Sequence, residues 1–429
     1  MTEPVLVVGG GVGGLVVAYD LARQGVPVTV LEADERTGGQ LAPVVVGGIA
    51  VDAGAESFAT RTPAVAELAA ELGLETTSPL DSPAWLIGAD GGAAPLPAAS
   101  VLGIPAEPFA ADVVALLGTG GAFRAELDKV IPLLRPAKYR SLGQLVRRRM
   151  GRKVLDRLVD PVVRGVHSSA ADAMPVEAAS PGLTAALGRA GSLAAAVADL
   201  RASAPAGSQV GGIVGGVHRL AERLVEEVVA HRGEIRAGAR VVDAQRNALT
   251  LATGERLRGR VVVAAPGIAS EPVRTRGIVL AIAAVESAAL DEAPRGTGAL
   301  VASGAPGIRA RAFTHSSAKW AWLGEAAGPG RHLVRCSYDG VPEDPERTLL
   351  ADLRAITGAA DIRLTDLAVR SWVRTLAAHA PADDGPLVAG EAASGTGLAT
   401  IVPRARALAQ DVIEHIGGSD RTGTDRGAP

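Results

Sequence analysis

The chain has 429 residues, of which 48% are hydrophobic and 21% are charged, and its formal net charge at pH 7 is −3. This composition is typical of a globular protein of two or three domains, and it gives no indication of nucleic-acid binding. The single cysteine, Cys336, excludes an internal disulfide and is expected to lie inert in a buried strand of a cytoplasmic protein. No window of about 18 uninterrupted apolar residues predicts a membrane span, and the first residues lack the basic region of a signal peptide.

The first predicted elements are a strand, a glycine-rich turn, a helix and a second strand. The apolar run 5–8 predicts a strand that is buried on both faces. A G-x-G-x-x-G motif follows it, formed by Gly9, Gly11 and Gly14. Such glycines permit a tight turn, close approach of the backbone to a pyrophosphate, and close packing of helix on strand. The run 26–32 predicts the second strand and ends at Glu32, whose carboxylate can accept hydrogen bonds from an adenosine ribose. A glycine-rich turn without a ligand is the alternative, but the four elements in register predict a dinucleotide site in a Rossmann-type α/β domain.

The middle of the chain is predicted to be largely helical. A helix over 62–75 is expected to begin with Thr62 as N-cap and Pro63 at its first position. Residues 85–106 predict a hairpin followed by a loop. Helical periodicity then runs over 108–205, where a capping box at 141–144 is expected to open one helix that continues to residue 163. Its candidate core positions are Leu145, Met150, Leu155 and Leu158.

The remainder is predicted to alternate between strands and loops. Residues 211–233 predict a glycine-rich turn into a long helix, and short β segments follow up to residue 267. Residues 277–372 are expected to alternate strand and loop, and residues from 387 onward to complete the dinucleotide fold. The cofactor domain is therefore expected to be discontinuous.

The choice between NAD and FAD depends on three further segments, because Glu32 suits either cofactor. Residues 35–40 and 51–58 resemble the second and third FAD-contact segments of the flavin amine oxidase superfamily. Residues 387–416 resemble its closing motif, in which a strand ends in Gly-Asp or Gly-Glu and a later helix begins beneath the flavin ring. The N-terminus of that helix would stabilise negative charge on the reduced ring. The resemblance implies FAD as the cofactor.

Three more segments narrow the resemblance to one family. Residues 94–105 resemble the Leu-Pro…Gly-Ile-Pro segment of the bacterial oxygen-dependent coproporphyrinogen III and protoporphyrinogen IX oxidases. Residues 141–174 resemble their Arg-Arg-Arg helix and Asp-Pro stretch, and residues 313–322 resemble their Ser-Ser-x-Lys-Trp segment. The resemblance implies an FAD-dependent oxidase of haem biosynthesis, in which a porphyrinogen loses a hydride and a proton, oxygen accepts the electrons and H2O2 is the by-product. It does not choose between the two porphyrinogens.

The resemblance also implies which residues contact FAD. The glycine turn supplies Gly9, Gly10, Gly11, Val12, Gly13 and Gly14. The next two segments supply Glu32, Ala33, Arg36, Gly39, Gln40, Gly54, Ala55, Glu56 and Ser57. Later segments supply Val241, through its backbone to the adenine, and Trp372, Gly390, Glu391, Gly397, Leu398 and Ala399 around the ring.

Other candidates carry an equally simple structural alternative. Lys319 is a candidate catalytic residue near flavin N5 through a water, or it is a solvated surface lysine. Arg61 is a candidate for binding a substrate propionate, or it is a surface arginine. A basic run could bind a porphyrin or anionic lipid, or it forms the wet side of a helix: Arg147, Arg148, Arg149, Arg152 and Lys153. Histidine and cysteine spacings predict no metal site.

The sequence departs from the family pattern at four places. His167 replaces a tyrosine, and Ala42 and Pro43 replace a common Arg-Thr pair. Residues 374–386 are shorter than the family segment and lack its Leu-Pro-Gln-Tyr run. Pro403 lies in the closing helix, where proline fits only in the first turn.

The resemblance divides the chain into regions and leaves two further functions open. An FAD-binding domain is expected at 1–80, 210–270 and 365–417, a helical domain at 108–205, a β-rich substrate domain at 85–107 and 271–364, and a flexible tail at 418–429. The alternatives are an oxidase of amines or polyenes and a non-catalytic flavin-binding paralogue. Peripheral contact with the inner membrane face and a downstream haem-pathway enzyme are the expected partners beside the substrate and oxygen.

Overall fold

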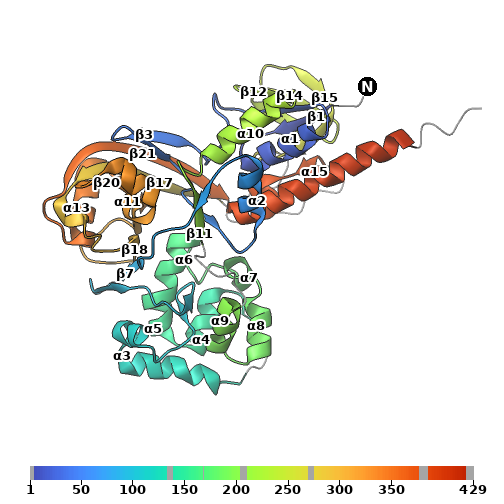
Figure 1. Cartoon of the computed structure of the whole chain (residues 1–429). Helices are drawn as coiled ribbons and strands as arrows, with labels where there is room; N and C mark the ends of the chain where they lie inside the picture. The colour runs from blue at the N-terminus through green and yellow to red at the C-terminus, as the bar shows by residue number, and fades with distance from the viewer. Residues whose placement is uncertain are drawn as a thin grey trace, which may run out of the picture.

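The computed structural model describes residues 4–132, 139–167, 169–202, 210–268, 275–375 and 385–421. Figure 1 shows three packed regions: a parallel sheet with its helices, a broad second sheet, and a cluster of helices below them. Each region has its own buried apolar core. The domain boundaries given above stay a prediction.

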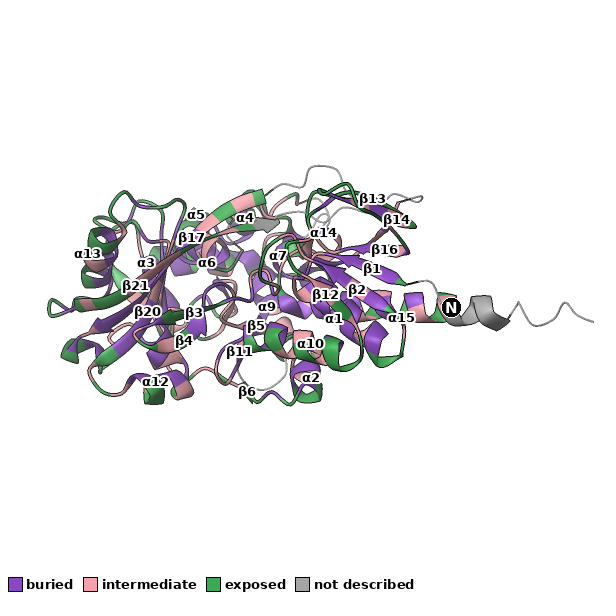
Figure 2. Ribbon diagram, turned by 90° about the horizontal axis from the view of Figure 1, so that it is seen from above, coloured by how far each residue is buried: buried purple, intermediate pink, exposed green. Residues whose placement is uncertain are grey.

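The parallel sheet has the strand order β12-β2-β1-β16-β22, and every neighbouring pair is parallel. Its strands are β1 (Val5–Val8), β2 (Val28–Leu31), β12 (Glu234–Arg236), β16 (Arg260–Val263) and β22 (Leu387–Val388). All four residues of β1 are buried, as a strand covered on both faces requires. Helices α1 (Val12–Arg23), α10 (Arg219–Ala230) and α15 (Leu398–Arg421) pack against one face. The antiparallel strands β13 (Val241–Gln245), β14 (Ala248–Leu251) and β15 (Arg256–Arg258) cover the other face (Figure 2).

Helix α1 ends in a motif that requires glycine. Gly25 has a φ of +72°, a conformation in which a side chain is strained. The Gly25 amide donates to the Ala22 carbonyl at 2.9 Å, and the Val26 amide donates to the Leu21 carbonyl at 3.1 Å. This pair of bonds is the Schellman arrangement, which satisfies the last carbonyls of the helix and turns the chain into β2.

The start of helix α2 (Ala64–Glu71) differs from the prediction. Pro63 precedes the first helical residue, and no side chain caps this end, so Thr62 as N-cap was wrong. The Thr62 hydroxyl donates instead to the carbonyl of Ala399 in α15, at 3.3 Å. That carbonyl would normally accept from the amide of residue 403, but Pro403 has no N–H. The hydroxyl therefore provides the hydrogen bond that the proline removes, and Pro403 is accommodated beyond the first turn.

The second sheet is mixed and has the order β21-β17-β20-β19-β18-β7-β8. Its strands are β7 (Trp85–Ile87), β8 (Ala93–Pro95), β17 (Thr275–Glu286), β18 (Gly298–Val301), β19 (Ala312–His315), β20 (Arg331–Tyr338) and β21 (Arg363–Thr375). Strands β7 and β8 form the hairpin expected within 85–106, and the short pair β9 (Ser100–Val101) and β10 (Ile104–Pro105) follows it. Residue Cys336 lies fully buried in β20, in the inert strand position predicted for it.

Both faces of the second sheet are covered. One face packs against α13 (Pro345–Thr357), a helix that the strand-and-loop prediction missed. The other face packs against the ribbon of β3 (Pro43–Val46) and β4 (Ile49–Asp52), and against α12 (Ala321–Ala327), which follows the single turn α11 (Ser316–Lys319). The departure at Ala42 and Pro43 lies where this ribbon begins.

The helical region contains α3 (Ala111–Glu126), α4 (Leu142–Arg149), α5 (Arg152–Val154), a π-helical segment (Leu155–Val159), α6 (Asp160–His167), α7 (Val176–Ala179), α8 (Leu183–Ala190) and α9 (Leu193–Ala202). The predicted single helix to residue 163 was wrong, because Gly151 has a φ of +96° and breaks it. The Ser141 hydroxyl caps α4 by accepting from the Gln144 amide at 3.2 Å. The expected core positions are all buried: Leu145, Met150, Leu155 and Leu158.

Three remaining expectations concern length and uncertain segments. Helix α15 runs to residue 421, past residue 418 where the tail was expected to begin. The side chain of His167 and residues 376–384 lie outside the described part of the chain. Among the described residues no single helix is long and apolar enough to span a membrane; only α8 and α9, bent by 116° at their junction, reach that length and composition as a pair.

Candidate cofactor site

A cavity of about 760 Å³ lies at the carboxyl ends of β1, β2 and β16. This volume falls within the range of roughly 300–1,000 Å³ that is usual for cofactor sites. The lining comes from within residues 8–13, 31–41, 239–242, 264–268 and 390–401, together with Ala55, Ser57 and Val373. The amino-terminal glycine turn and the distant carboxy-terminal segment therefore meet around one cavity, as the sequence predicted.

The glycine turn leaves its backbone bare toward this cavity. Gly9 has a φ of +99°, and a Cβ on Gly14 would lie 2.1 Å from the Gly9 carbonyl oxygen, so neither position tolerates a side chain. A Cβ on Gly11, in contrast, would meet no atom within 4 Å. Gly11 is the N-cap of α1 and provides no side-chain cap, so the first amides of the helix are available to a ligand. The turn fits a pyrophosphate.

The closing segment packs directly on the glycine turn. A Cβ on Gly13 would lie 2.6 Å from the Gly390 Cα atom, so the two backbones touch. Gly397 has a φ of +102° and turns the chain into α15, whose first residue, Leu398, lines the cavity. The positive end of a long helix therefore faces the cavity, where it favours negative charge on a ligand.

Glu32 is held in place at the end of β2. One carboxylate oxygen accepts from the Gly10 amide at 2.7 Å and the other accepts from the Asp34 amide at 3.0 Å. These bonds orient the carboxylate in the cavity wall, where it suits the hydroxyls of a ribose. Val241 lines the same end of the cavity, beside Arg240.

Sequence reasoning missed several lining residues. They are Val8, Leu31, Asp34, Gly38, Leu41, Ala239, Arg240, Val242, Ala264, Ala265, Pro266, Gly267, Ile268, Val373 and Ile401. Most of them follow the ends of predicted strands, and ligands of open α/β sheets bind beyond the carboxyl ends of the strands. That rule, applied to the run Ala264–Gly267 after β16, could have identified this part of the wall.

Some predicted contact residues lie behind the wall instead of in it. Gly10, Gly14, Arg36, Gly54, Glu56, Trp372 and Ala399 do not line the cavity. Arg36 donates to the Gly39 carbonyl at 2.8 Å and so braces its own loop. The Trp372 indole donates to the Ala53 carbonyl at 2.6 Å, while its neighbour Val373 faces the cavity. These side chains support the residues that do line it.

Lys319 lies beside Glu56 and not in the cavity wall. The Lys319 ammonium is 3.4 Å from a Glu56 carboxylate oxygen and 4.8 Å from the centre of the Trp320 ring. The side chain is 16% exposed, so a freely solvated lysine is also excluded. The positive charge of Lys319 therefore pairs with the nearly buried carboxylate of Glu56.

Arg61 and the basic run are also engaged by other side chains. Arg61 donates to the Thr400 hydroxyl at 2.6 Å and so joins the start of α2 to the first turn of α15. Within the run, Arg147 pairs with Asp172, Arg149 with Asp128 and Arg152 with Asp156. Arg149 is fully buried. The positive charge of this candidate basic face is thus largely neutralised by paired carboxylates.

The described residues include no group of three or more His, Cys, Asp or Glu that could hold a metal ion.

Comparison with known proteins connects this geometry to a family. The family described as "Flavin containing amine oxidoreductase" matches residues 12–292. A coproporphyrinogen III oxidase of Mycobacterium tuberculosis is 31% identical over 405 residues, which cover 87% of this chain and 87% of that protein. One of Bacillus subtilis is 28% identical over 187 residues, or 41% of this chain and 39% of that protein.

Two solved structures share the fold. A protein from Exiguobacterium sp. 255-15, to which protoporphyrinogen oxidase activity has been ascribed, superposes with a TM-score of 0.79 over 96% of this chain and 99% of that chain, at 24% identity. Cyclohexylamine oxidase from Brevibacterium oxydans superposes with a TM-score of 0.65 over 96% of this chain and 100% of that chain, at 16% identity. At such identities the likeness shows the fold alone.

Proposed function

This chain belongs to the flavin containing amine oxidoreductases, and we propose that within this family it oxidises coproporphyrinogen III to the porphyrin, with FAD as cofactor and oxygen as electron acceptor. The observation that carries the proposal is the 31% identity to a mycobacterial coproporphyrinogen III oxidase over nearly the whole length of both chains. The ordered segments that resemble porphyrinogen oxidases support the same substrate class. Protoporphyrinogen IX is the alternative substrate within this class.

The residues around the large cavity fit FAD. In the proposed arrangement the bare backbone of Gly11 to Gly13 binds the pyrophosphate, Glu32 binds the adenosine ribose and Val241 contacts the adenine. The N-terminus of α15, at Leu398, lines the cavity, and it would favour negative charge on the flavin ring. When bound, FAD supplies a two-electron acceptor that oxygen regenerates with release of H2O2.

Oxidation of a porphyrinogen requires few acid or base groups from the protein. Removal of hydride from a bridge and of a proton from nitrogen is driven by the aromatisation of the macrocycle itself. The main tasks of the protein are therefore to orient the macrocycle against the ring and to shape the electrostatics there. A Lys319 whose charge is held by Glu56 is compatible with such a reaction.

Anaerobic mixing of the purified FAD-loaded protein with coproporphyrinogen III tests the proposal. We expect the flavin absorbance to bleach in the absence of oxygen. Once oxygen is admitted, the flavin colour should return, H2O2 should accumulate and a porphyrin spectrum should appear, because the six-electron oxidation to the porphyrin requires three rounds of two-electron transfer to FAD. A flavin that stays oxidised with both porphyrinogens would contradict the proposal. Peroxide release with amines alone would favour the amine oxidase alternative, and a yellow protein that turns over neither class would favour the non-catalytic one.

Replacement of Lys319 by methionine separates a charge partner from a proton-transfer group. We expect turnover of the porphyrinogen to fall by less than about tenfold, because Glu56 retains Arg335, Trp320 and Ser316 as partners. Loss of a general acid or base would instead lower the rate by roughly 10²- to 10⁴-fold. Steady-state kinetics of the FAD-loaded variant, beside Lys129→Met on the helical region as control, distinguish the two.

Two partner assignments belong to the same proposal. Haem biosynthesis requires a later enzyme to take up the porphyrin, and peripheral contact with a membrane surface is the second assignment. Co-sedimentation with anionic vesicles, with and without porphyrin, tests the membrane contact.

A further inference from the structure

The turn over residues 52–57 alternates between the cofactor cavity and the second sheet. Ala55 and Ser57 line the cavity, whereas Gly54 and Glu56 face the other way. This alternation is the two-residue period of an extended chain, in which successive side chains point to opposite faces. The same short turn therefore contacts both the cofactor cavity and the sheet behind it.

Arg335 of β20 clamps the sheet side of the turn through two hydrogen bonds. One guanidinium nitrogen donates to the Glu56 carboxylate at 3.0 Å and the other donates to the Gly54 carbonyl at 2.7 Å. On its opposite side the turn rests on the loop before β3, where the Ala55 amide donates to the Gln40 carbonyl at 3.3 Å. A Cβ on Gly54 would lie 2.0 Å from that same oxygen, so the packing leaves no room for a side chain at this position.

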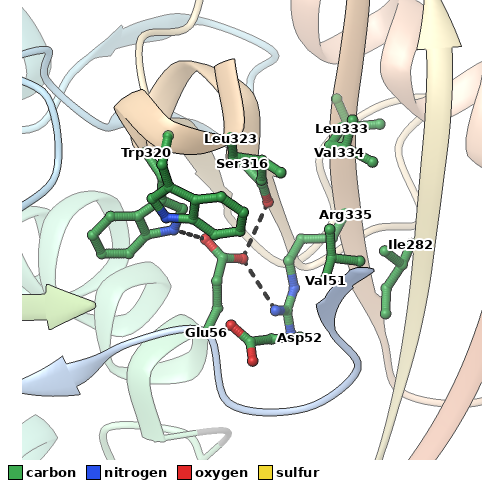
Figure 3. A pocket seen from close by; sticks show the side chains of 11 residues that line it. Val51, Asp52, Glu56, Ile282, Ser316, Trp320, Leu323, Leu333, Val334 and Arg335 are labelled. Carbon is green, nitrogen blue, oxygen red and sulfur yellow. Dashed lines mark hydrogen bonds and ion pairs between the residues drawn. The ribbon is translucent and has the colours of Figure 1, made fainter. Parts of the chain in front are cut away.

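Glu56 is the centre of this clamp (Figure 3). Besides Arg335, its carboxylate accepts from the Trp320 indole at 2.7 Å and from the Ser316 hydroxyl at 3.2 Å, and it pairs with Lys319. Burial by itself raises the pKa of Glu56, but the charges of Lys319 and Arg335 and the hydrogen bonds outweigh it and lower the pKa to about 2. The carboxylate is therefore ionised at neutral pH.

Asp52 fixes the other end of the same turn. One of its carboxylate oxygens accepts from the Val217 amide at 3.0 Å, and the other accepts from the amide and the imidazole of His218 at 2.8 and 2.9 Å. Val217 and His218 directly precede α10, the helix that packs against the parallel sheet. Asp52 and Glu56 both border a cavity of about 20 Å³, which has room for a water but not for a substrate.

We propose that Glu56 is a positioning residue: with Arg335 it holds the turn whose Ala55 and Ser57 face FAD, and so couples the second sheet to the position of the flavin. The carboxylate itself does not contact the cofactor. The proposal rests on the FAD binding of the proposed function and not on its substrate. Removal of groups that orient ligand-contacting residues costs about 10- to 100-fold in affinity or activity at metal centres, and an effect of that order is expected here.

The test compares Glu56→Gln with the paired variant Glu56→Gln/Arg335→Met, and with Glu325→Gln on the exposed face of α12 as matched control. The paired variant removes both charges of the Glu56–Arg335 pair, so that neither is left without the other, and keeps the test valid where the single variant folds poorly. The dissociation constant for FAD is measured on apoprotein by quenching of flavin fluorescence. The visible circular dichroism and the reduction potential of the bound flavin are measured on the loaded protein, without substrate.

We expect FAD to bind at least about tenfold more weakly in both Glu56 variants, with an altered visible circular dichroism and a shifted potential, and Glu325→Gln to match the unmodified protein in all three. Native FAD affinity, dichroism and potential in the paired variant would overturn the proposal, even where its melting temperature is lower, because a purely structural ion pair predicts that outcome. All three measurements are made without substrate, so their outcome does not depend on whether the protein oxidises porphyrinogens.

Discussion

Replacement of Gly11 by glutamate is expected to give a folded protein that binds FAD far more weakly. Gly11 has φ −73° and ψ 174°, an extended conformation open to every residue, and a Cβ there would meet no atom within 4 Å. The fold therefore accepts the side chain. The carboxylate, however, would occupy the cavity beside the amides assigned to the pyrophosphate.

The expected loss of affinity is large. Opposing two like charges in a binding site costs several kcal/mol, and about 4 kcal/mol corresponds to a loss of roughly 10³-fold in affinity. Titration of apoprotein with FAD measures the loss, and circular dichroism with thermal melting of the apoprotein checks the fold. Gly11→Gln has almost the same volume without the charge and should bind FAD better than Gly11→Glu. A yellow Gly11→Glu protein of native affinity would remove the glycine turn from the cofactor site.

Gly120→Glu serves as the matched control for the charge and the residue type. Gly120 is exposed on α3, and a Cβ there also meets no atom within 4 Å. Its FAD affinity and apoprotein stability should equal those of the unmodified protein. A loss of affinity there would indicate that added negative charge acts on the whole protein and not on the cavity.

The glycine turn was predictable because its constraints are local. The positive φ of Gly9 and the contact of Gly14 with the Gly9 carbonyl exclude every side chain, so the sequence must show glycine at these places. The same holds for Gly25 at the end of α1. Where the backbone geometry leaves one residue type, the residue type identifies the geometry.

Other features depend on partners far away in the chain. Thr62 carries the local signal of an N-cap, but its hydroxyl is drawn to the carbonyl that Pro403 leaves without a donor. Glu56 belongs to the segment assigned to the cofactor, yet Arg335 and Trp320 orient its carboxylate away from the cavity. These outcomes follow from packing of α15 on α2 and of β20 on the turn, which no local pattern encodes.

Helix α13 shows a different cause of error, since its signals are local and were overlooked. Asp344 caps the helix by accepting from the Arg347 amide at 2.9 Å, Pro345 occupies the first position, and Gly358 ends it with a φ of +79°. Cap, proline and terminal glycine together are a complete signature of a helix. The strand patterns on both sides of this helix favoured strands and loops over the whole of 277–372, so the helix was not predicted.

Arg149→Met is expected to destabilise the helical region by about 3–5 kcal/mol, because it leaves a buried charge without its partner. Asp128 is fully buried, and one of its carboxylate oxygens pairs with Arg149 while the other accepts from the Ala194 amide at 3.0 Å. The guanidinium also donates to the carbonyls of Ile131 and Gly191 at 3.0 and 2.9 Å. Loss of the arginine therefore leaves the buried Asp128 carboxylate without its charge partner and removes the hydrogen bonds that join it to two further segments.

The neighbouring Arg148→Met is the control, since it removes the same charge from the same helix at an exposed position and should change stability by no more than about 0.5 kcal/mol. Urea unfolding followed by far-ultraviolet circular dichroism measures both. The visible spectrum of the bound flavin should stay native in each, because no described residue of the helical region lines the cavity. Figure 1 shows the helical region below the parallel sheet. The double variant Asp128→Asn/Arg149→Met should recover part of the loss, since no buried charge remains in it. Equal unfolding midpoints for Arg149→Met and Arg148→Met would contradict the prediction, because they would mean that the buried pair of Arg149 and Asp128 contributes nothing to the stability of the fold.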